Sequence, residues 1–481
     1  MHASHLLKSA KAHVAPEQRL ASYAQSETRL TWTALFFDSF PRAEIYLVGG
    51  SVRDVLLGRP ANDLDLVIKG VPHEELQAWL LGHGAAEFVG RFGTFKFIPH
   101  GMGGTEPIDI ALPRKEFISE NHSSSSRDIK VTFDPTLSIK EDLARRDFTV
   151  NAMAFNLRNG HLIDPFLGLK DLEDGIVNAV LVPHHRFHED ASRIIRGLRF
   201  ASQLGFAIEA GTWQAMCANI HLLNQTTAHP DDGHFIYSVP REIIGREFLL
   251  GFGAHPEHTL KLWRDSGALH LFMPQLADLE GQEHQGAYAR TQKLIHALFS
   301  PVLMNQYGVH EPPLNAQVAA LLLYPSLEDP AHAHSICMKL HFHQFGKNHR
   351  SYVDCDEVLW LVKHARILQT TDPAAMRPSA FEHTFLSPRG KTLTILIHAL
   401  LLAEDRHSVE RERLHVLRRL EADFQNRVAP PLLSGSDLAA LDIPPGPQYR
   451  ELLAHARDAQ LSGKIATKPE AIQLVIKLRS S

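Results

Sequence analysis

The chain has 481 residues, of which 44% are hydrophobic and 21% are charged. At roughly 100–200 residues per domain this length predicts about three domains with a sizeable core, and the composition excludes a disordered or collagen-like chain. Lysine and arginine total 49 against 54 aspartates and glutamates, a formal net charge of −5. The charge of the whole chain is therefore not the basic footprint expected of a nucleic-acid binder.

Cysteine content and hydropathy bear on the compartment. The three cysteines, Cys217, Cys337 and Cys355, are too few for a disulfide framework, which favours a reducing compartment. The longest apolar run, residues 393–403, is too short to span a bilayer. The N-terminus shows no apolar core of a signal peptide. We therefore expect a cytoplasmic protein without a membrane partner.

The first part of the chain has the pattern of a mixed α/β domain. Residues 1–30 are polar and predict a helical lead-in. Four segments have the β-branched or alternating pattern of strands: 44–48, 63–68, 92–98 and 108–112. Residues 71–81 predict a helix, and the serine-rich stretch 121–128 predicts a loop.

Beyond about residue 185 the strand signals fade and helical periodicity dominates. The clearest helical segments are 192–204, 241–250, 284–299, 317–323 and 411–420. The predicted fold class is therefore α+β, with a small mixed sheet at the N-terminal end followed by an all-α remainder.

A Gly-Gly turn separates the first predicted strand from a helix. Glycines allow the backbone to approach a ligand closely, and the free N–H groups at a helix start attract phosphate. Arg53 lies within reach of the same position, since it follows Gly49 and Gly50 closely. The turn matches neither the P-loop nor the dinucleotide fingerprint. Alone it is compatible with an ordinary turn.

Two aspartates follow the turn at a spacing that suits a metal site. Asp63 and Asp65 are separated by one residue in a predicted strand, so their carboxylates point to the same face. Like charges at this distance repel unless a cation neutralises them, and Mg²⁺ prefers such oxygen ligands. Two-metal phosphoryl transfer uses such a pair. The alternative is two solvated aspartates in a turn.

A third pattern combines acidic and basic residues at helical spacing. Asp190, Arg193, Arg196 and Arg199 recur every three residues and are expected on one helix face. An aspartate beside an arginine supplies the acceptors and donors needed to read the edge of a base without a template. The alternative is a helix with ordinary Asp–Arg pairs.

Together with three longer stretches, these elements resemble the bacterial-type (class II) tRNA nucleotidyltransferase and poly(A) polymerase family, and within it the CCA-adding enzymes. The stretches are EDLARRDFTVNAMA at 141–154, IDPFLGLKDL at 163–172 and HEDASRIIRGLRF at 188–200. All five segments occur in the family's order.

The resemblance implies a domain organisation. After the lead-in at 1–30, it implies a polymerase-β-like nucleotidyltransferase head and a nucleotide-reading helical neck, at 31–180 and 181–245. It further implies a helical body that resembles a degenerate His-Asp domain and a tRNA-binding helical tail, at 246–350 and 351–481.

The resemblance also implies roles for individual residues. Asp63 and Asp65 would bind metal, and Asp109 would position the primer hydroxyl as a third catalytic carboxylate. The alternative for Asp109 is a surface acid on an edge strand. The residues expected to bind the nucleotide are Gly50, Ser51, Arg53, Arg146, Asp147, Asn151, Asp190, Arg193, Arg196 and Arg199.

Two further regions could suggest a second metal site, but we expect none in either. Many relatives carry a His-Asp phosphohydrolase site in the helical part, but Tyr324 and Pro325 stand where that pair is expected. We interpret this part as a remnant without hydrolase activity. Histidines around Cys337 could suggest zinc, but 31 histidines make such clusters expected by chance.

Several activities share these motifs. The long segment 114–140 argues against CC-only addition, and the single arginine in residues 89–96 argues against a poly(A) polymerase. We therefore expect Mg²⁺-dependent addition of CCA, or of its terminal A, to the tRNA 3′ end from CTP and ATP. The alternatives are a poly(A) polymerase and a non-catalytic RNA-binding protein on the same scaffold. The sequence indicates no oligomeric state.

Overall fold

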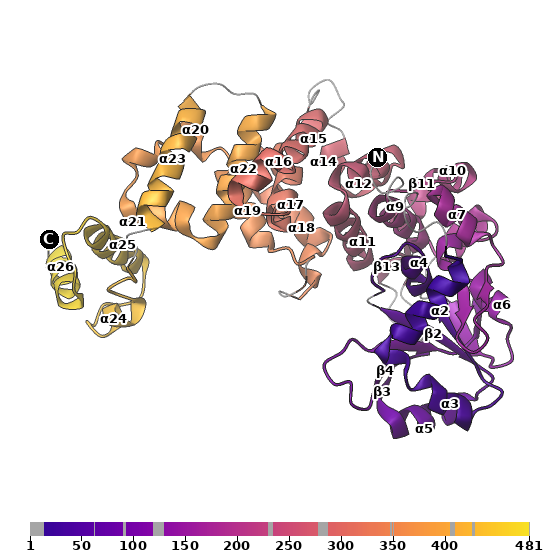
Figure 1. Ribbon diagram of the computed structural model, residues 1–481. Coiled ribbons are helices and arrows are strands. Elements are labelled where there is room, and N and C mark those ends of the chain that lie inside the picture. Colours follow the sequence, from indigo (N-terminus) through magenta and orange to yellow (C-terminus); the bar gives the residue numbers. More distant parts are fainter. Residues whose placement is uncertain are drawn as a thin grey trace. The chain divides into compact units, whose positions relative to one another are not determined.

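The computed structural model describes residues 14–61, 63–89, 93–118, 129–228, 234–277, 287–346, 349, 351–404, 409–425 and 429–480. The chain divides into two compact units, Met1–Leu271 and Phe272–Ser481 (Figure 1). Within the described ranges, no helix has both the length and the apolar character needed to cross a membrane.

Unit 1 is built around a seven-stranded sheet in the order β3-β4-β5-β2-β1-β8-β9. Its strands are β1 (Glu44–Val48), β2 (Leu64–Lys69), β3 (Gly84–Val89), β4 (Thr94–Pro99), β5 (Ile108–Ala111), β8 (Ala154–Asn156) and β9 (Leu162–Ile163). The β2–β5 pair is parallel and the other pairs are antiparallel. The predicted mixed sheet and its four predicted strands are confirmed.

Helices cover this sheet. They are α2 (Pro16–Ser26), α3 (Thr33–Ser39), α4 (Gly50–Leu56), α5 (His73–His83), α6 (Ile139–Ala144) and α7 (Gly168–Asp174), with short 3₁₀ turns η1 (Thr28–Leu30) and η3 (Thr149–Asn151). The lead-in helix α2 packs against α4, because Leu20 is buried and Arg19 donates to the Leu56 carbonyl at 2.8 Å. Residues 1–13 lie outside the described ranges.

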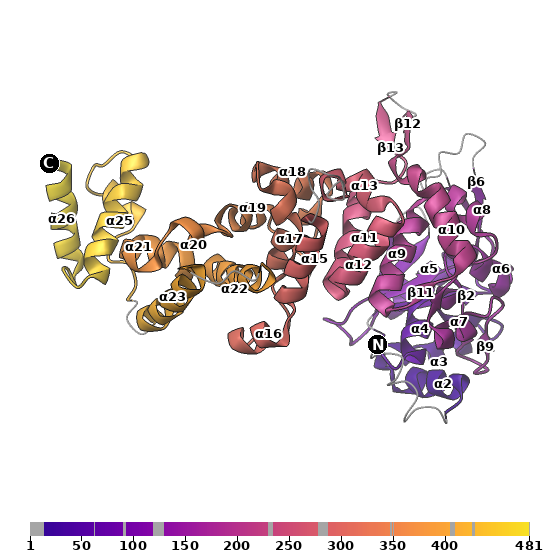
Figure 2. The same cartoon turned by 90° about the horizontal axis from the view of Figure 1, so that it is seen from above.

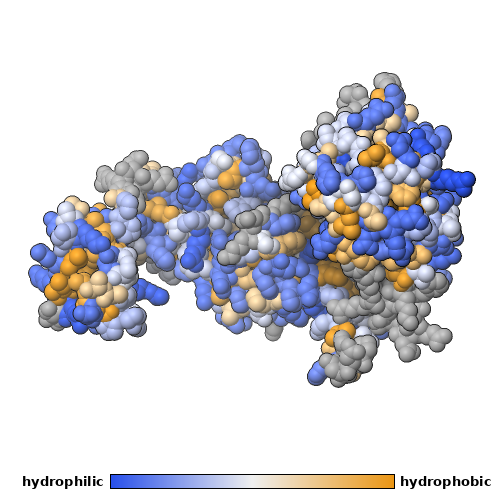
Figure 3. Space-filling view, turned by 90° about the horizontal axis from the view of Figure 1, so that it is seen from below, coloured by the Kyte–Doolittle hydropathy of each residue, from blue (hydrophilic) through white to orange (hydrophobic). Residues whose placement is uncertain are grey.

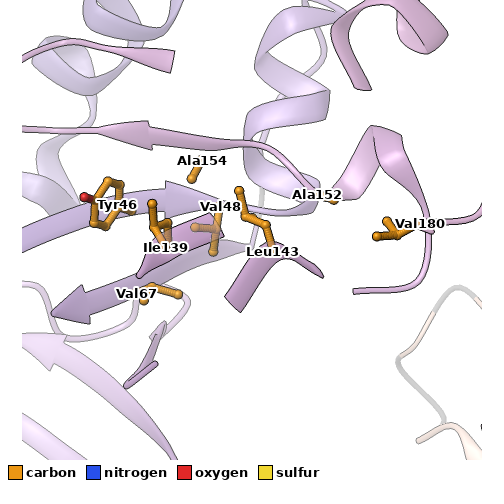
Figure 4. Packing of buried hydrophobic residues seen from close by; sticks show 8 residues of the cluster. All are labelled: Tyr46, Val48, Val67, Ile139, Leu143, Ala152, Ala154 and Val180. Carbon is orange, nitrogen blue, oxygen red and sulfur yellow. The ribbon is translucent and has the colours of Figure 1, made fainter. Parts of the chain in front are cut away.

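One core cluster fixes the part of the sheet that carries the site. Tyr46 and Val48 point to one face of β1, and they pack with Val67 of β2 and with Ile139 and Leu143 of α6 (Figure 4). Residues i and i+2 of a strand share a face, so β2 places Asp65 on the same face as the core residue Val67. The apolar core therefore anchors the strand just below the acidic residue.

The rest of unit 1 is mostly helical. Its elements are the hairpin β6 (Arg114–Ile118) and β7 (Ile129–Phe133), β10 (Ile176–Val177), α8 (Pro183–Glu189), α9 (Ser192–Leu204), β11 (Ala207–Ile208), α10 (Ala210–Asn219), η4 (Ile220–Asn224), β12 (Thr226–Ala228), β13 (Phe235–Tyr237), α11 (Arg241–Ala254), α12 (Pro256–Asp265) and α13 (Ala268–Phe272). The predicted loop 121–128 lies outside the described residues.

Two details correct the expected neck. It also contains strands. β11 pairs with β10 of the expected head, and β12 pairs with β13 in a hairpin that projects from the helices (Figure 2). Helix α11 runs through the expected boundary between residues 245 and 246, and unit 1 continues to Leu271. The remaining predicted domain limits stay predictions.

The described elements of unit 2 are helices. They are α14 (Pro274–Ala277), α15 (Ala287–Leu298), α16 (Pro301–Tyr307), α17 (Leu314–Leu323), η6 (Tyr324–Ser326), α18 (Ala331–Lys339), η7 (Phe342–Gln344), α19 (Cys355–His364), α20 (Ile367–Thr370), η8 (Pro373–Ala375), α21 (Pro378–Phe381), the π-turn η9 (Glu382–Leu386), α22 (Pro388–Ala403), α23 (Val409–Gln425), α24 (Gly435–Ala439), α25 (Pro447–Leu461) and α26 (Lys468–Ser480).

The last three helices have an apolar core of their own. Leu438 of α24, Leu452 of α25 and Val475 of α26 are buried together. The surface of this part combines hydrophilic side chains with an apolar area (Figure 3), and Ile476 is half exposed.

Candidate active site

Aspartates from two neighbouring strands meet on one face of the sheet. The register places Asp65 beside Asp109 across β2 and β5, and Lys96 beside Asp109 across β4 and β5. Side chains directly opposite each other on adjacent strands share a face, so the three form a row. Asp63 immediately precedes β2 and is exposed. Because β5 lies between β4 and β2, the edge-strand alternative for Asp109 is wrong.

The electrostatic environment of Asp65 is that of a crowded acidic site. Burial is the largest cause of a raised pKa at the Asp65 carboxyl; Arg146 opposes it, and the charges of Asp109 and Asp63 add to it. Carboxylates that are buried and close to one another favour the binding of a cation, because its positive charge stabilises their ionised forms. The donor set is thus chemically suited to a hard divalent ion.

This donor set is not a complete metal cage. Within the described part of the chain, no group of three or more His, Cys, Asp or Glu side chains is arranged to hold a metal ion. Mg²⁺ commonly takes one or two carboxylates and completes its shell with water and substrate phosphates. Asp63 and Asp65 fit that partial role.

The Gly-Gly turn brings backbone against these carboxylates. Gly49 has φ +68° and ψ −133°, a conformation that side chains disfavour. A Cβ at Gly49 would lie 2.8 Å from Nη1 of Arg146 and 3.5 Å from Oδ2 of Asp65. Gly50 is the first residue of α4. The turn, the carboxylate and Arg146 therefore converge at one point.

Ser51 connects the turn to the acidic strand. Its buried hydroxyl donates to the Asp63 carbonyl at 2.8 Å and accepts from the Asp65 amide at 3.1 Å. The hydroxyl thus bonds the backbone on both sides of Leu64. This assigns Ser51 to the positioning of the two aspartates, a contact that the sequence did not indicate.

A continuous polar network runs from α4 to α9. Arg53 forms a two-pronged ion pair with Asp54 and donates from Nη1 to the Asn151 side-chain oxygen at 2.6 Å. The Asn151 amide donates to Asp147 Oδ1 at 3.3 Å, and Arg196 donates twice to Asp147 Oδ2, at 2.9 and 2.7 Å. Four of the predicted nucleotide-binding residues are therefore linked to one another.

The Asp147–Arg196 pair gives a pH-dependent prediction. Burial alone would raise the pKa of Asp147, but the Arg196 charge and hydrogen bonds outweigh it and hold that pKa at about 2. The ionised Asp147 carboxylate therefore stabilises the fold above its unfolded-state pKa, and this stabilisation is lost as the pH falls toward 2. Because the pKa falls from 3.8 to about 2, Asp147→Asn should cost about 2–3 kcal/mol at pH 7. The deficit should shrink between pH 4 and pH 2.

Denaturant unfolding at pH 7, 4 and 3 measures this difference. Asp174→Asn is the matched control, since Asp174 forms an exposed pair with Lys170 at 3.9 Å and its loss should change little. Equal unfolding free energies for wild type and Asp147→Asn at pH 7 would contradict the assignment.

The expected base-reading helix is interrupted. Helix α8 ends at Glu189 and α9 begins at Ser192, with Asp190 extended between them at φ −151°. The Asp190 carboxylate accepts a hydrogen bond at 2.9 Å from the amide of Ser192, the first residue of α9. The prediction that Asp190 shares a helix with the three arginines is therefore wrong, because this local hydrogen bond favours a break in the helix.

The arginines of α9 have protein partners. Arg193 is buried and donates to Glu189 at 2.9 Å and to the Arg145 carbonyl at 3.1 Å. Arg199 pairs with the buried Glu247 of α11. The guanidinium groups of Arg53, Arg196 and Arg199 lie 5.3, 5.4 and 3.8 Å from the centre of the Phe200 ring.

Two aspartates that support the site residues were not identified from the sequence. Buried Asp142 accepts two bonds from Arg145, at 2.9 and 2.7 Å, and lies 3.6 Å from Arg146. Its position three and four residues before the arginines was an available helical signal. Asp171 accepts from Thr149 at 2.6 Å, so it braces the segment that carries Asn151.

The expected His-Asp position holds another polar group. The Tyr324 hydroxyl donates to Glu404 at 2.9 Å, and Arg366 donates to the same oxygen at 2.7 Å. Residues 278–286, in the same helical part of the chain, lie outside the described ranges.

Comparisons with known proteins found one matching family model and several similar chains. Residues 45–178 match the family model described as Poly A polymerase head domain. The chain is 40% identical over 244 residues to a CCA-adding enzyme of Lactiplantibacillus plantarum, a match that covers 50% of this chain and 53% of that relative. The chain thus spans about half the length of the curated relatives it matches.

Solved structures extend the likeness of the fold over nearly the whole chain. The Bacillus stearothermophilus CCA-adding enzyme in complex with CTP has a TM-score of 0.64 at 23% identity, covering 97% of this chain and 98% of that chain. The Thermotoga maritima CCA-adding enzyme complexed with tRNA-CCA has a TM-score of 0.57 at 20% identity, covering 95% and 97%.

The mixed sheet with its aspartates and Gly-Gly turn, followed by a helical remainder, confirms the predicted α+β fold class. Within this fold, residues 45–178, which carry the turn and the three aspartates, are the part that matches the poly A polymerase head domain. The predicted resemblance to class II tRNA nucleotidyltransferases, and within them to CCA-adding enzymes, is confirmed.

Proposed function

We propose that this chain is a template-independent nucleotidyltransferase that adds CCA, or its terminal A, to the 3′ end of tRNA from CTP and ATP. The observation that carries this proposal is the acidic row of Asp65 and Asp109 beside the Gly49 turn and Arg146. Relatives named CCA-adding enzymes, and similar folds solved with CTP and with tRNA, support it. Such an enzyme would act in the cytoplasm.

The reaction forms a bond between the primer 3′ oxygen and the α-phosphorus, and it breaks the bond from that phosphorus to pyrophosphate. Asp63 and Asp65 would hold Mg²⁺, which when bound supplies positive charge to the phosphates. The start of α4 at Gly50 and the Arg53 guanidinium would hold the triphosphate. Asp109 would accept a hydrogen bond from the primer hydroxyl and so orient it.

Base selection would occur at the junction of α8 and α9. A base that reaches Asp190 would meet its carboxylate and, three residues further along the chain, the Arg193 guanidinium. Reading by Arg193 requires its bond to Glu189 to be exchanged for a bond to the base. We assign Arg196 and Arg199 to supporting roles, because their partners are Asp147 and Glu247. The helical tail would bind the body of the tRNA.

An incorporation assay tests the function. The protein is incubated with Mg²⁺ and labelled CTP or ATP, together with tRNA that lacks CCA, tRNA that ends in CC, or an unrelated RNA. We expect label from CTP only in the first tRNA, and label from ATP in the CC-ending tRNA.

The other outcomes separate the alternatives. ATP label confined to CC-ending tRNA, without CTP label in any RNA, identifies A-only addition. ATP label in the unrelated RNA identifies poly(A) synthesis. Binding of tRNA without any incorporation would identify a non-catalytic RNA-binding protein and overturn the proposal.

A further inference from the structure

The acidic row contains a cation that the sequence motifs do not include. The Lys96 ammonium lies 2.7 Å from Asp109 Oδ1, and its strand neighbours Asp109 directly. Asp109 in turn neighbours Asp65 across the parallel pair. Lys96 is thus the outermost member of a row of charged side chains that ends at the proposed metal ligands.

The Lys96–Asp109 pair contributes little to the stability of the fold. Both side chains are substantially exposed, at 45% and 36%. Exposed ion pairs contribute little to stability, because solvent screens them. A purely structural account therefore gives this pair a small role.

The charge of Lys96 acts on all three aspartates of the site. The hydrogen bond to Asp109 is the main cause of a raised pKa at Lys96, and the charges of Asp109, Asp63 and Asp65 contribute as well. Asp65 receives opposing positive charge from Arg146 first and from Lys96 second. Three carboxylates and two cations leave this cluster with one net negative charge, and the loss of Lys96 would leave two.

We propose that Lys96 is a positioning residue for nucleotidyl transfer: it holds Asp109 by one oxygen and offsets the charge of the acidic row. The other Asp109 oxygen is thereby left for the primer hydroxyl. This inference rests on the proposed function, in which Asp109 orients that hydroxyl. Lys96 itself need not touch substrate.

The test compares Lys96→Met and Lys96→Arg with the wild-type chain. In the methionine variant we expect kcat to fall about tenfold or more with the KM for CTP within about twofold of wild type, because Asp109 is released while the triphosphate contacts remain. The arginine variant should recover most of kcat, since it keeps the charge and can reach the same oxygen.

A readout independent of turnover is Mn²⁺ binding, measured by electron paramagnetic resonance without nucleotide. The added negative charge should tighten Mn²⁺ binding about threefold or more in Lys96→Met. Lys69→Met is the matched control, because Lys69 pairs with Glu44 at 3.2 Å across β2 and β1, away from the acidic row. It should change neither quantity.

The outcomes are distinct. Wild-type kcat and unchanged Mn²⁺ binding in Lys96→Met would overturn the proposal, as would equal losses in the methionine and arginine variants. If the wild-type chain incorporates no nucleotide, the proposed function fails, and the Mn²⁺ comparison still tests the effect of Lys96 on the acidic row. Thermal unfolding of each variant verifies that it is folded.

Discussion

The Asp65→Asn protein should incorporate nucleotide at least about 100-fold more slowly than wild type, yet unfold at the same or a higher temperature. The two effects diverge because burial and the neighbouring charges of Asp109 and Asp63 disfavour the ionised form of the Asp65 carboxylate. Asparagine keeps the shape and removes the repulsion. It also removes one of the two proposed metal ligands. Incorporation rate and thermal unfolding are measured on the same preparation.

Two further variants sharpen this prediction. Asp63→Ala should lose turnover while tRNA binding, measured by filter retention, stays within a few fold of wild type. Asp38→Asn changes an exposed aspartate on α3 and should affect neither property. Full activity of Asp65→Asn would refute the metal assignment.

Gly49→Ala should destabilise unit 1 by about 1–3 kcal/mol and abolish nucleotide incorporation. The new Cβ would require a strained backbone at φ +68°, and it would lie 2.8 Å from the Arg146 guanidinium. The turn or Arg146 must shift, and either shift disturbs the proposed triphosphate site. Denaturant unfolding and the incorporation assay measure the two effects.

Gly82→Ala is the matched control for Gly49→Ala. A Cβ at Gly82, in helix α5, meets no atom within 4 Å. Alanine favours helix over glycine by roughly 1 kcal/mol, so this variant should be at least as stable as wild type and fully active. Similar losses in both variants would show that the effect at Gly49 is not specific to the turn.

Local patterns predicted the parts of the site that are close in sequence. The β-branched strand 44–48, the Gly-Gly turn and the Asp-x-Asp spacing are each local patterns, and they form β1, the start of α4 and the start of β2. The Lys96–Asp109–Asp65 row was not predictable in this way. It depends on the strand order β4-β5-β2, which is fixed by pairing between distant segments.

Two other elements show where local signals fail. Strand β3 begins with Gly84, Ala85 and Ala86, residues without strand preference, and its place comes from pairing with β4. The three-residue spacing from Asp190 predicted one helix, but the side-chain bond to Ser192 ends it. The partner of an ion pair also depends on the tertiary fold, since Arg199 pairs with Glu247 of a separate helix.

The network from Arg53 through Asn151 and Asp147 to Arg196 has a consequence for protein engineering. Each of these side chains is hydrogen-bonded to its neighbour in the network. Replacing one of them by the residue that a related protein has at that position would therefore remove a hydrogen-bond partner of its neighbour. Grafted specificity changes on α9 would therefore succeed only as a matched set that includes the residues on α4 and η3. The side chains of the network must therefore be exchanged together.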